Sequence, residues 1–163
     1  MVKRIFDFIS ALLGLIALFP FLVIISLLIK FTSKGSVFYK QERTGQKAKL
    51  FTILKFRSMI DGHGDNNTVT VIGDQRITNF GSFMRKYKID ELPGLWNVLR
   101  GDMSLVGPRP DLPHYYNLLQ GEDRKILELK PGVTGPASLK YANEEELLKS
   151  QQDPKKYHYE VIF

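Results

Sequence analysis

An uncharged apolar run near the amino terminus constrains this chain more than any other feature. The run, residues 8–29, contains 22 residues without a charged side chain. As a straight helix it is roughly 33 Å long, enough to cross a hydrocarbon core of about 30 Å. A secretory signal peptide does not fit, because its apolar region has about 7–15 residues and a small-residue cleavage site follows it. The run therefore predicts a helix in a membrane.

Two features favour a helix that enters the membrane and returns over one that crosses it. Pro20, near the middle of the run, removes a helical hydrogen bond and clashes with the preceding turn, so we expect a kink there. Basic residues flank the run on both sides, and a simple crossing would place one basic cluster outside, against the positive-inside rule. These cations are Lys3, Arg4, Lys30, Lys34 and Lys40. Because prolines also occur in spanning helices, both paths stay open on these grounds.

Charge and composition bound the classes of partner. The chain has 163 residues, enough for one domain, and its lack of cysteine excludes disulfides and thiolate metal sites. Its net charge of +6 indicates an anionic partner. The cations are dispersed and adjoin the apolar run, so lipid head groups and phosphate substrates explain them better than nucleic acid. Asp7 lies one turn after Lys3 and Arg4, and we expect these side chains to form an exposed ion pair or cap.

Turn residues divide the rest of the chain into short elements. Two β-type runs, residues 37–41 and 50–54, flank Thr44-Gly45-Gln46 and predict a β-hairpin. Residues 61–67 (DGHGDNN) predict a polar loop. Apolar spacing and stop signals predict helices over residues 77–89, 91–100, 114–129 and 144–149, the last with a capping box of Asn143 and Glu146. The predicted fold class is α+β, mainly helical, with a membrane helix over residues 1–33 and a second unit over residues 34–163.

Two adjacent acids, Asp90 and Glu91, stand just before Pro93. Because proline is tolerated in the first turn of a helix but not in its interior, we expect a helix to begin near Asp90, with this carboxylate as its N-cap. The free N–H groups and the helix dipole there favour an ionised carboxylate, as a nucleophile or metal ligand requires, and form a phosphate site. An Asp-Glu pair at a helix start is most often only a cap, so the pair alone carries no function.

Arg109 is held between two prolines in the segment GPRP. Prolines on both sides restrict the backbone and reduce the entropy lost when the guanidinium binds a phosphate. Arg85, Lys55 and Arg57 are further candidate cations, although each taken singly fits a solvated surface. Acids that hold a divalent cation, beside cations that bind phosphate, indicate phosphoryl-transfer chemistry. The other polar candidates are a turn residue, Asp102, and three histidines without zinc spacing, His63, His114 and His158.

Taken in order along the chain, these segments resemble the small monotopic polyprenyl-phosphate phosphoglycosyl transferases of the bacterial sugar transferase family. The matching segments are KRIFD (3–7), the proline-broken apolar run, FYKQERTG (38–45), KFRSM (55–59), DELP (90–93), LWNVLRGDMS (95–104), VGPRP (106–110) and KPGVTG (130–135). The resemblance covers nearly the whole chain and is most specific between residues 90 and 110. Family members commonly continue with further amphipathic helical sequence, so we expect a C-terminal tail to be missing.

The resemblance implies a re-entrant helix in the cytoplasmic leaflet of the bacterial inner membrane, with residues 34–163 as an interfacial catalytic domain of short amphipathic helices around the active site. It implies transfer of a sugar-1-phosphate from a UDP-sugar to undecaprenyl phosphate, with release of UMP and a requirement for Mg²⁺. That reaction is the first membrane step in assembling an O-antigen, capsule, exopolysaccharide or glycoprotein glycan. Inner-membrane phospholipid is then a further partner, and a homo-oligomer is left open.

The resemblance also assigns roles to residues. Asp90 is the nucleophile and forms a covalent aspartyl-phosphosugar. Asp90 and Glu91 hold Mg²⁺, with the role of Glu91 open between metal partner and acid/base. Arg85, Arg109 and Lys55 bind phosphate oxygens.

Two other functions stay open on the residues alone. The same acids and arginines fit a membrane-bound Mg²⁺-dependent phosphohydrolase, which would consume the donor without a lipid acceptor. They also fit a non-enzymatic membrane-tethered module in which Asp90 and Glu91 only cap a helix. Substitution of Asp90 by asparagine distinguishes this module from an enzyme, because the module would keep all its measurable properties.

Overall fold

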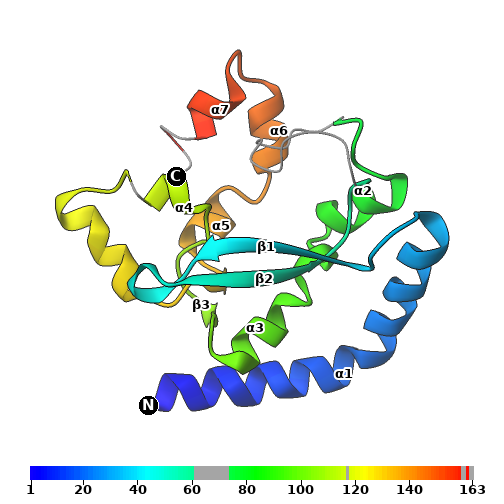
Figure 1. The fold of residues 1–163 in the computed structure, drawn as a ribbon, viewed down its shortest axis with the longest axis horizontal. Helices are drawn as coiled ribbons and strands as arrows, with labels where there is room; N and C mark the ends of the chain where they lie inside the picture. Colours follow the sequence, from blue (N-terminus) through cyan, green and yellow to red (C-terminus); the bar gives the residue numbers. More distant parts are fainter. Residues whose placement is uncertain (61–73, 117, 159–160, 162–163) are drawn as a thin grey trace.

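The computed structural model describes residues 1–60, 74–116, 118–158 and 161 of the chain. Figure 1 shows one long helix along the lower edge and a two-stranded hairpin across the middle, with short helices around the hairpin. In chain order, with η marking 3₁₀ helices, the elements are α1 (Val2–Thr32), β1 (Phe38–Thr44), η1 (Gln46–Ala48), β2 (Leu50–Phe56), α2 (Asn79–Lys86), η2 (Ile89–Glu91), α3 (Gly94–Arg100), β3 (Ser104–Val106), α4 (Pro113–Tyr116), η3 (Gly121–Glu128), β4 (Gly132–Thr134), α5 (Pro136–Lys140), α6 (Glu144–Lys149) and α7 (Pro154–Tyr157). The predicted class, mainly helical with a small antiparallel sheet, is confirmed.

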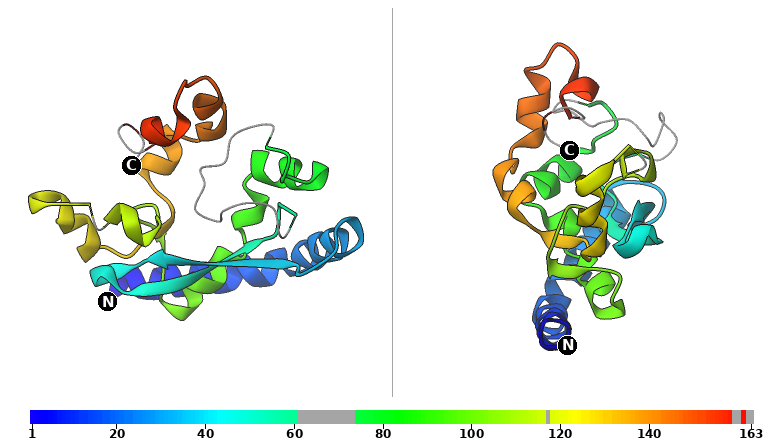
Figure 2. Two further views of the ribbon diagram at one scale, coloured as in Figure 1. Left: turned by 45° about the horizontal axis from the view of Figure 1, so that its top comes forward. Right: turned by 90° about the vertical axis from the view of Figure 1, so that its left-hand side faces the viewer.

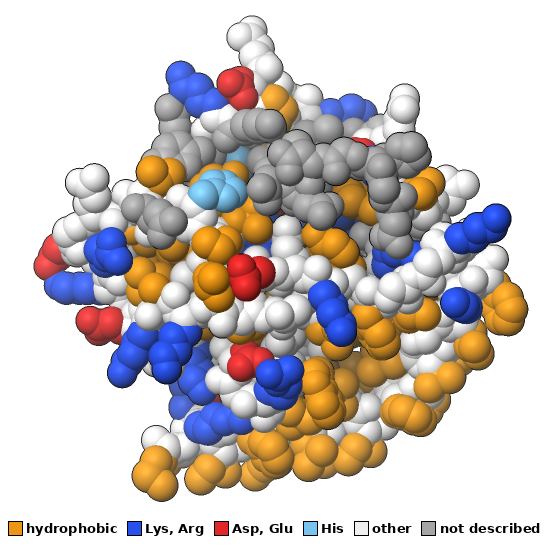
Figure 3. All heavy atoms as spheres, viewed as in Figure 1, with side chains coloured by type: hydrophobic (Ala, Val, Ile, Leu, Met, Phe, Trp, Pro, Cys, Tyr) orange, Lys and Arg blue, Asp and Glu red, His pale blue; other side chains and the backbone are white. Residues whose placement is uncertain are grey.

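Helix α1 confirms the predicted apolar helix. It continues through Pro20 and is long and apolar enough, by length and composition, to cross a membrane. Only 11% of its most apolar segment is buried. Most of its large apolar side chains are exposed, and Figure 3 shows apolar side chains gathered along the lower and right-hand edge. Figure 1 shows that the ribbon changes direction along its length. A kink at Pro20 and a re-entrant path stay predictions.

Two arginines cap helix C-termini across the fold, where a cation is favourable. Arg4 of α1 donates to the carbonyl oxygens of Val98 and Leu99 in the last turn of α3, at 2.5 and 2.7 Å. Arg57, which is 4% exposed, donates to the carbonyl and hydroxyl oxygens of Ser33 at the end of α1, at 3.0 and 2.7 Å. Arg57 was a candidate phosphate ligand, but the structure buries it against the end of α1 instead.

Asp7 joins α1 to strand β3. Its carboxylate accepts hydrogen bonds from the Ser104 hydroxyl at 2.8 Å and the Leu105 N–H at 3.2 Å. The expected ion pair with Lys3 is confirmed, at 3.2 Å. The expected exposure of Asp7 is wrong, because only 4% of the residue is exposed and its oxygens satisfy polar groups inside the molecule.

Strands β1 and β2 confirm the predicted antiparallel hairpin and are paired along their whole length. Asn97 of α3, which is 1% exposed, fastens the other edge of β2. Its side-chain oxygen accepts from the Leu54 N–H at 3.0 Å, and its amide nitrogen donates to the Thr52 carbonyl at 2.8 Å. A single amide thus fixes α3 against the hairpin.

Two small apolar clusters hold α1, the hairpin and the short helices together. Full burial of one such side chain contributes about 1.5–3 kcal/mol. Helix α1 contributes to both clusters, so one face packs on the rest of the molecule while the other is exposed. The clusters are Ala11, Ile53, Val98 and Met103, and Ile25, Ile29, Phe56 and Met84.

A parallel pair of short strands, β3 and β4, was not predicted. The Gly107 N–H donates to the Thr134 carbonyl at 3.0 Å, and the Gly132 N–H donates to the Pro108 carbonyl at 2.8 Å. The two backbones approach so closely that a Cβ on Gly132 would lie 2.2 Å from the nitrogen of Gly107. This contact fixes the backbone that leads into Arg109.

Helix boundaries near the acidic pair differ from prediction. The helix predicted over residues 77–89 is α2, which spans only Asn79–Lys86 and begins at the N-cap Thr78. The helix predicted over residues 91–100 begins later, at Gly94, and ends as expected at Gly101, whose φ of 91° stops it.

The C-terminal predictions have mixed outcomes. The helix predicted over residues 114–129 is instead α4 and the 3₁₀ helix η3, whose first residue, Gly121, has a left-handed φ of 53°. The helix predicted over residues 144–149 is confirmed as α6, but its capping box is wrong because the Asn143 side chain makes no capping hydrogen bond. The loop predicted over residues 61–67, with His63, lies outside the described residues.

Candidate active site

Asp90 and Glu91 lie in the tight 3₁₀ turn η2, between α2 and α3. The turn follows Lys88, which has a left-handed φ of 55°. The expected N-cap role of Asp90 is wrong, because α3 begins at Gly94 and its N-cap position is Pro93, without a side-chain cap. The acidic pair is therefore positioned by a turn and by packing.

Asp90 is buried, with 6% of the residue exposed. Its Oδ1 atom has no hydrogen-bond partner within the part of the chain that the structure describes. Burial raises the pKa of Asp90, although Lys55 and Arg85 favour its ionised form. The sequence predicted that this carboxylate caps a helix and is held ionised by the free N–H groups there. In the structure Asp90 is buried outside α3, and among the described residues no N–H donates to its Oδ1 atom. A buried acid with a free acceptor is typical of a functional site.

Glu91 has the opposite electrostatic balance. Burial acts to raise its pKa, but the Lys55 ammonium, 2.7 Å from its carboxylate, acts with Arg109 and Lys88 to lower the pKa. Lys55 extends from β2, so the hairpin supplies this cation. Two adjacent acids with pKa shifts of opposite sign are suited to different roles.

Arg109 is anchored at both its backbone and its side chain. Its carbonyl oxygen accepts from the Tyr116 hydroxyl at 2.6 Å. Its guanidinium lies 2.5 Å from Glu144 and 3.8 Å from Asp111. Burial acts to lower the pKa of Arg109, but these two carboxylates reverse the effect and raise it. Glu91 also acts on Arg109 electrostatically, so the structure brings Arg109 and the acidic pair into one site.

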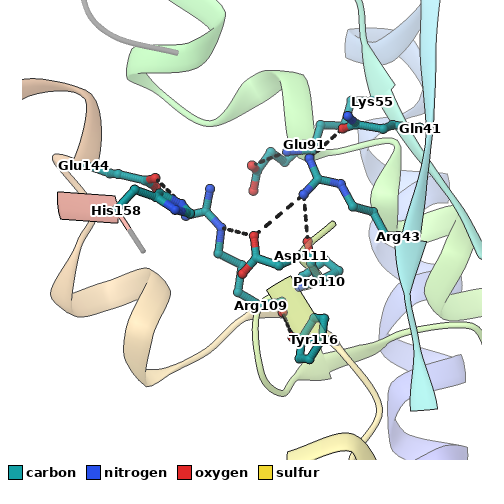
Figure 4. A network of polar contacts seen from close by, with 10 residues as sticks. All are labelled: Gln41, Arg43, Lys55, Glu91, Arg109, Pro110, Asp111, Tyr116, Glu144 and His158. Carbon is teal, nitrogen blue, oxygen red and sulfur yellow. Dashed lines mark hydrogen bonds and ion pairs between the residues drawn. The ribbon is translucent and has the colours of Figure 1, made fainter. Parts of the chain in front are cut away.

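Arg43 of β1 is a site residue that the sequence did not single out. Its guanidinium donates to the Pro110 carbonyl at 3.3 Å and lies 3.7 Å from Asp111. Burial lowers its pKa, and Asp111 opposes that effect. Figure 4 shows Arg43 and Arg109 converging on Asp111 from opposite sides. The signal in the sequence was the place of Arg43 in a segment that carries the family resemblance.

Glu144 and His158 reach the same network from the C-terminal helices. One carboxylate oxygen of Glu144 contacts Arg109, and the other lies 3.2 Å from His158 Nε2. Burial acts to raise the pKa of Glu144, but His158 and Arg109 outweigh it and lower the pKa to about 2. The sequence offered Glu144 only as the start of a helix and His158 as a scattered histidine. Their role depends on tertiary contact, which no local pattern encodes.

The remaining candidates lie as follows. Arg85 acts on Asp90 electrostatically. Asp102 is a turn residue as predicted and pairs with Arg100 at 3.4 Å. His114 is exposed, and its ring lies tilted by 38° beside that of Tyr115, with ring centroids 4.2 Å apart.

Asp90 and Glu91 are the side chains that best fit a divalent cation. Across residues 1–60, 74–116, 118–158 and 161, no group of three or more His, Cys, Asp or Glu side chains is placed to hold a metal ion. Mg²⁺, however, commonly binds through one or two carboxylates, with substrate phosphates and water as further ligands. The unpartnered oxygen of Asp90 supplies an acceptor of this kind, so the pair fits a cation that binds together with a phosphate substrate.

Comparisons with known proteins point to the family that the sequence segments resemble. The bacterial sugar transferase family model matches residues 1–162. The chain is 38% identical over 150 residues to the exopolysaccharide production protein ExoY of Sinorhizobium fredii, covering 82% of this chain and 66% of that protein. It is 41% identical over 143 residues to a UDP-glucose:undecaprenyl-phosphate glucose-1-phosphate transferase of Xanthomonas campestris, covering 84% and 29%. A protein of the same name from Klebsiella pneumoniae is 36% identical over 167 residues, covering 99% and 35%. The chain thus spans about two thirds of the first relative and about a third of the other two.

Proposed function

This chain belongs to the bacterial sugar transferase family, and from that premise we propose that it transfers a sugar-1-phosphate from a UDP-sugar to undecaprenyl phosphate. The names of two relatives, which specify UDP-glucose and undecaprenyl phosphate, support the substrate classes, and the name of the third supports exopolysaccharide as the glycan. The observation in this chain that carries the proposal is the buried Asp90 carboxylate, whose Oδ1 is unpartnered among the described residues.

Asp90 acts as the nucleophile. One of its oxygens bonds to the β-phosphorus of the UDP-sugar, the bond from that phosphorus to the bridging oxygen breaks, and UMP leaves with the electron pair. An oxygen of undecaprenyl phosphate then bonds to the same phosphorus and breaks the bond to Asp90, which regains its carboxylate. Two steps on one carboxylate suit a soluble donor and a lipid acceptor that arrive in turn.

The surrounding charges support an ionised Asp90 and an anionic substrate. Lys55 and Arg85 favour the Asp90 carboxylate against burial. Arg85, Arg109 and Lys55 bind phosphate oxygens as charged donors. Mg²⁺, when bound by Asp90 and Glu91, neutralises diphosphate charge and favours the ionised acids. The lowered pKa of Glu91 suits a metal ligand better than a proton carrier near neutral pH.

The reaction takes place at the cytoplasmic face of the inner membrane, with α1 re-entrant and kinked at Pro20. One observation supports contact with the membrane and another supports the re-entrant path. The outer apolar face of α1 is exposed, as contact with phospholipid requires. Both ends of α1 bind the same body, Arg4 to α3 and Ser33 to Arg57. A crossing helix would carry its two ends to opposite sides of a membrane about 30 Å thick.

Measurement of UMP release from a panel of UDP-sugars, with Mg²⁺ and undecaprenyl phosphate, tests the proposal. We expect lipid-dependent release from one sugar and its loss in Asp90→Asn, which keeps the size of the side chain. Asp102→Asn removes a turn acid outside the site and serves as the matched control. Release without the lipid would indicate a hydrolase, and near-normal release in Asp90→Asn would exclude Asp90 as the nucleophile.

A further inference from the structure

Each Lys and Arg side chain that Figure 4 labels in the network around Arg109 is paired with a carboxylate. The three pairs are Lys55–Glu91 at 2.7 Å, Arg43–Asp111 at 3.7 Å and Arg109–Glu144 at 2.5 Å. On Arg109, Glu144 engages Nη1 and Asp111 lies 3.8 Å from Nε, so an acid borders each of the two N–H pairs through which a guanidinium binds an oxyanion. A phosphate that binds Arg109 through two parallel N–H groups therefore has to displace one of these acids.

Glu144 differs from the other two acids in the element that carries it. Glu91 lies in η2 and Asp111 follows β3, both close to the hairpin. Glu144 opens α6, which follows β4, and Figure 1 and the right-hand view of Figure 2 show α6 and α7 at the end of the molecule opposite α1. Its Arg109 contact joins residues 35 positions apart in the chain. Glu144 is therefore the acid that can leave without moving the acidic pair or the hairpin.

We propose that Glu144 occupies the phosphate position on Arg109 while the donor is absent, and that a donor phosphate displaces it and releases α6 from Arg109. This inference rests on the proposed function, in which Arg109 binds a phosphate of the UDP-sugar. Carboxylate and phosphate oxygens are both acceptors that a guanidinium binds, so one position serves either.

The contacts around the pair favour exchange over permanent closure. Glu144 keeps a second partner, His158, which belongs to the same C-terminal segment and can move with it. Arg109 keeps Asp111 at 3.8 Å, so it stays in place when Glu144 leaves. The Arg109 side chain is 38% exposed and the Glu144 side chain 10%, so an incoming anion can reach the guanidinium from solvent. Because its pKa is lowered to about 2, Glu144 stays ionised near neutral pH, and a competing anion rather than protonation has to release it.

Calorimetric titration of inorganic pyrophosphate into the detergent-solubilised full chain tests this exchange. Glu144→Gln removes the charge and keeps the size, and we expect the pyrophosphate Kd to fall about three- to tenfold. Glu146→Gln removes the same charge from an exposed position on α6, so it controls for net charge, and its Kd should stay within about twofold of the original. In an Arg109→Ala background, Glu144→Gln should change nothing.

Several outcomes overturn the inference. A Kd that is unchanged or raised in Glu144→Gln would make Glu144 a support for Arg109. An equal gain in Glu146→Gln, or in the Arg109→Ala background, would reduce the effect to net charge. If Glu144→Gln does not fold, hydrogen exchange of the unmutated chain decides. Pyrophosphate should then speed exchange in residues 144–149, and unchanged exchange would refute displacement.

UMP release, measured on the same preparations, separates this inference from the proposed function. If UMP is released but Glu144→Gln binds pyrophosphate no more tightly than the unmutated chain, the exchange is overturned and the transferase stands. A gain in anion affinity without UMP release from any UDP-sugar would support the exchange and overturn the transferase.

Discussion

Replacement of Asn97 by alanine tests how the contact between α3 and the hairpin supports the site. The Asn97 side chain is 1% exposed and bonds the Leu54 N–H at 3.0 Å and the Thr52 carbonyl at 2.8 Å. Leu54 is partly buried, so its unpaired N–H costs about 1–3 kcal/mol. Thr52 is exposed, water can replace its partner, and that loss is about 0.5–1.5 kcal/mol. We expect Asn97→Ala to lower the free energy of unfolding by about 1.5–4.5 kcal/mol.

Urea titration in detergent, followed by the fluorescence of Trp96, measures this loss. Trp96 is the single tryptophan in the sequence and lies on α3 beside Asn97, so it reports the element under test. Asn79→Ala, at an exposed position in α2, is the matched control and should change stability by less than about 0.5 kcal/mol. Because Lys55 follows Leu54 on β2, UMP release should fall together with stability. A loss below about 1 kcal/mol in Asn97→Ala would refute the argument that this amide fastens the hairpin.

Three further perturbations test the backbone, the nucleophile and the membrane helix. Gly132→Ala should lower the free energy of unfolding by about 3 kcal/mol, because its Cβ would lie 2.2 Å from the backbone nitrogen of Gly107. Gly94→Ala is the control, because its Cβ would meet nothing within 4 Å, and equal urea midpoints for the two variants would contradict the argument. Lys88→Met should move the acid limb of the pH profile of kcat/KM to higher pH, because Lys88 opposes the rise in the pKa of Asp90 that burial causes. An acid limb that moves to lower pH would exclude Asp90 as the titrating group. Pro20→Leu should straighten α1, and accessibility labelling that still finds both flanks on one side would show that Pro20 does not set the topology.

Local signals predicted the elements whose cause is local. The uncharged run over residues 8–29 requires a helix because an apolar environment leaves backbone groups no other partners. The hairpin follows from two β-type runs around a turn, and the end of α3 follows from Gly101, which adopts a left-handed conformation readily. Segment resemblance also named Asp90, Glu91, Lys55, Arg85 and Arg109 as site residues, and their roles stay predictions.

Predictions failed where a contact between distant residues decided the outcome. Asp90 was expected at a helix start, but packing places it in a buried turn and raises its pKa instead. Asp7 was expected in solvent, but it bonds β3, whose first residue is 97 positions away in the chain. Arg57 was a candidate phosphate ligand, but its guanidinium donates a hydrogen bond to Ser33 at the end of α1.

The sequence by itself determined the apolar helix and the hairpin, because hydropathy and turn preference are properties of short segments. The groups that carry the proposed chemistry were named by the resemblance of several segments to one family. Only the tertiary structure decided which charge faces which. It pairs Lys55 with Glu91, holds Arg43 and Arg109 against Asp111, and brings Glu144 from the C-terminal helices onto Arg109. The physical reason is that pKa values and ion pairs depend on burial and on distances of a few ångströms, and those distances exist only after the chain has packed.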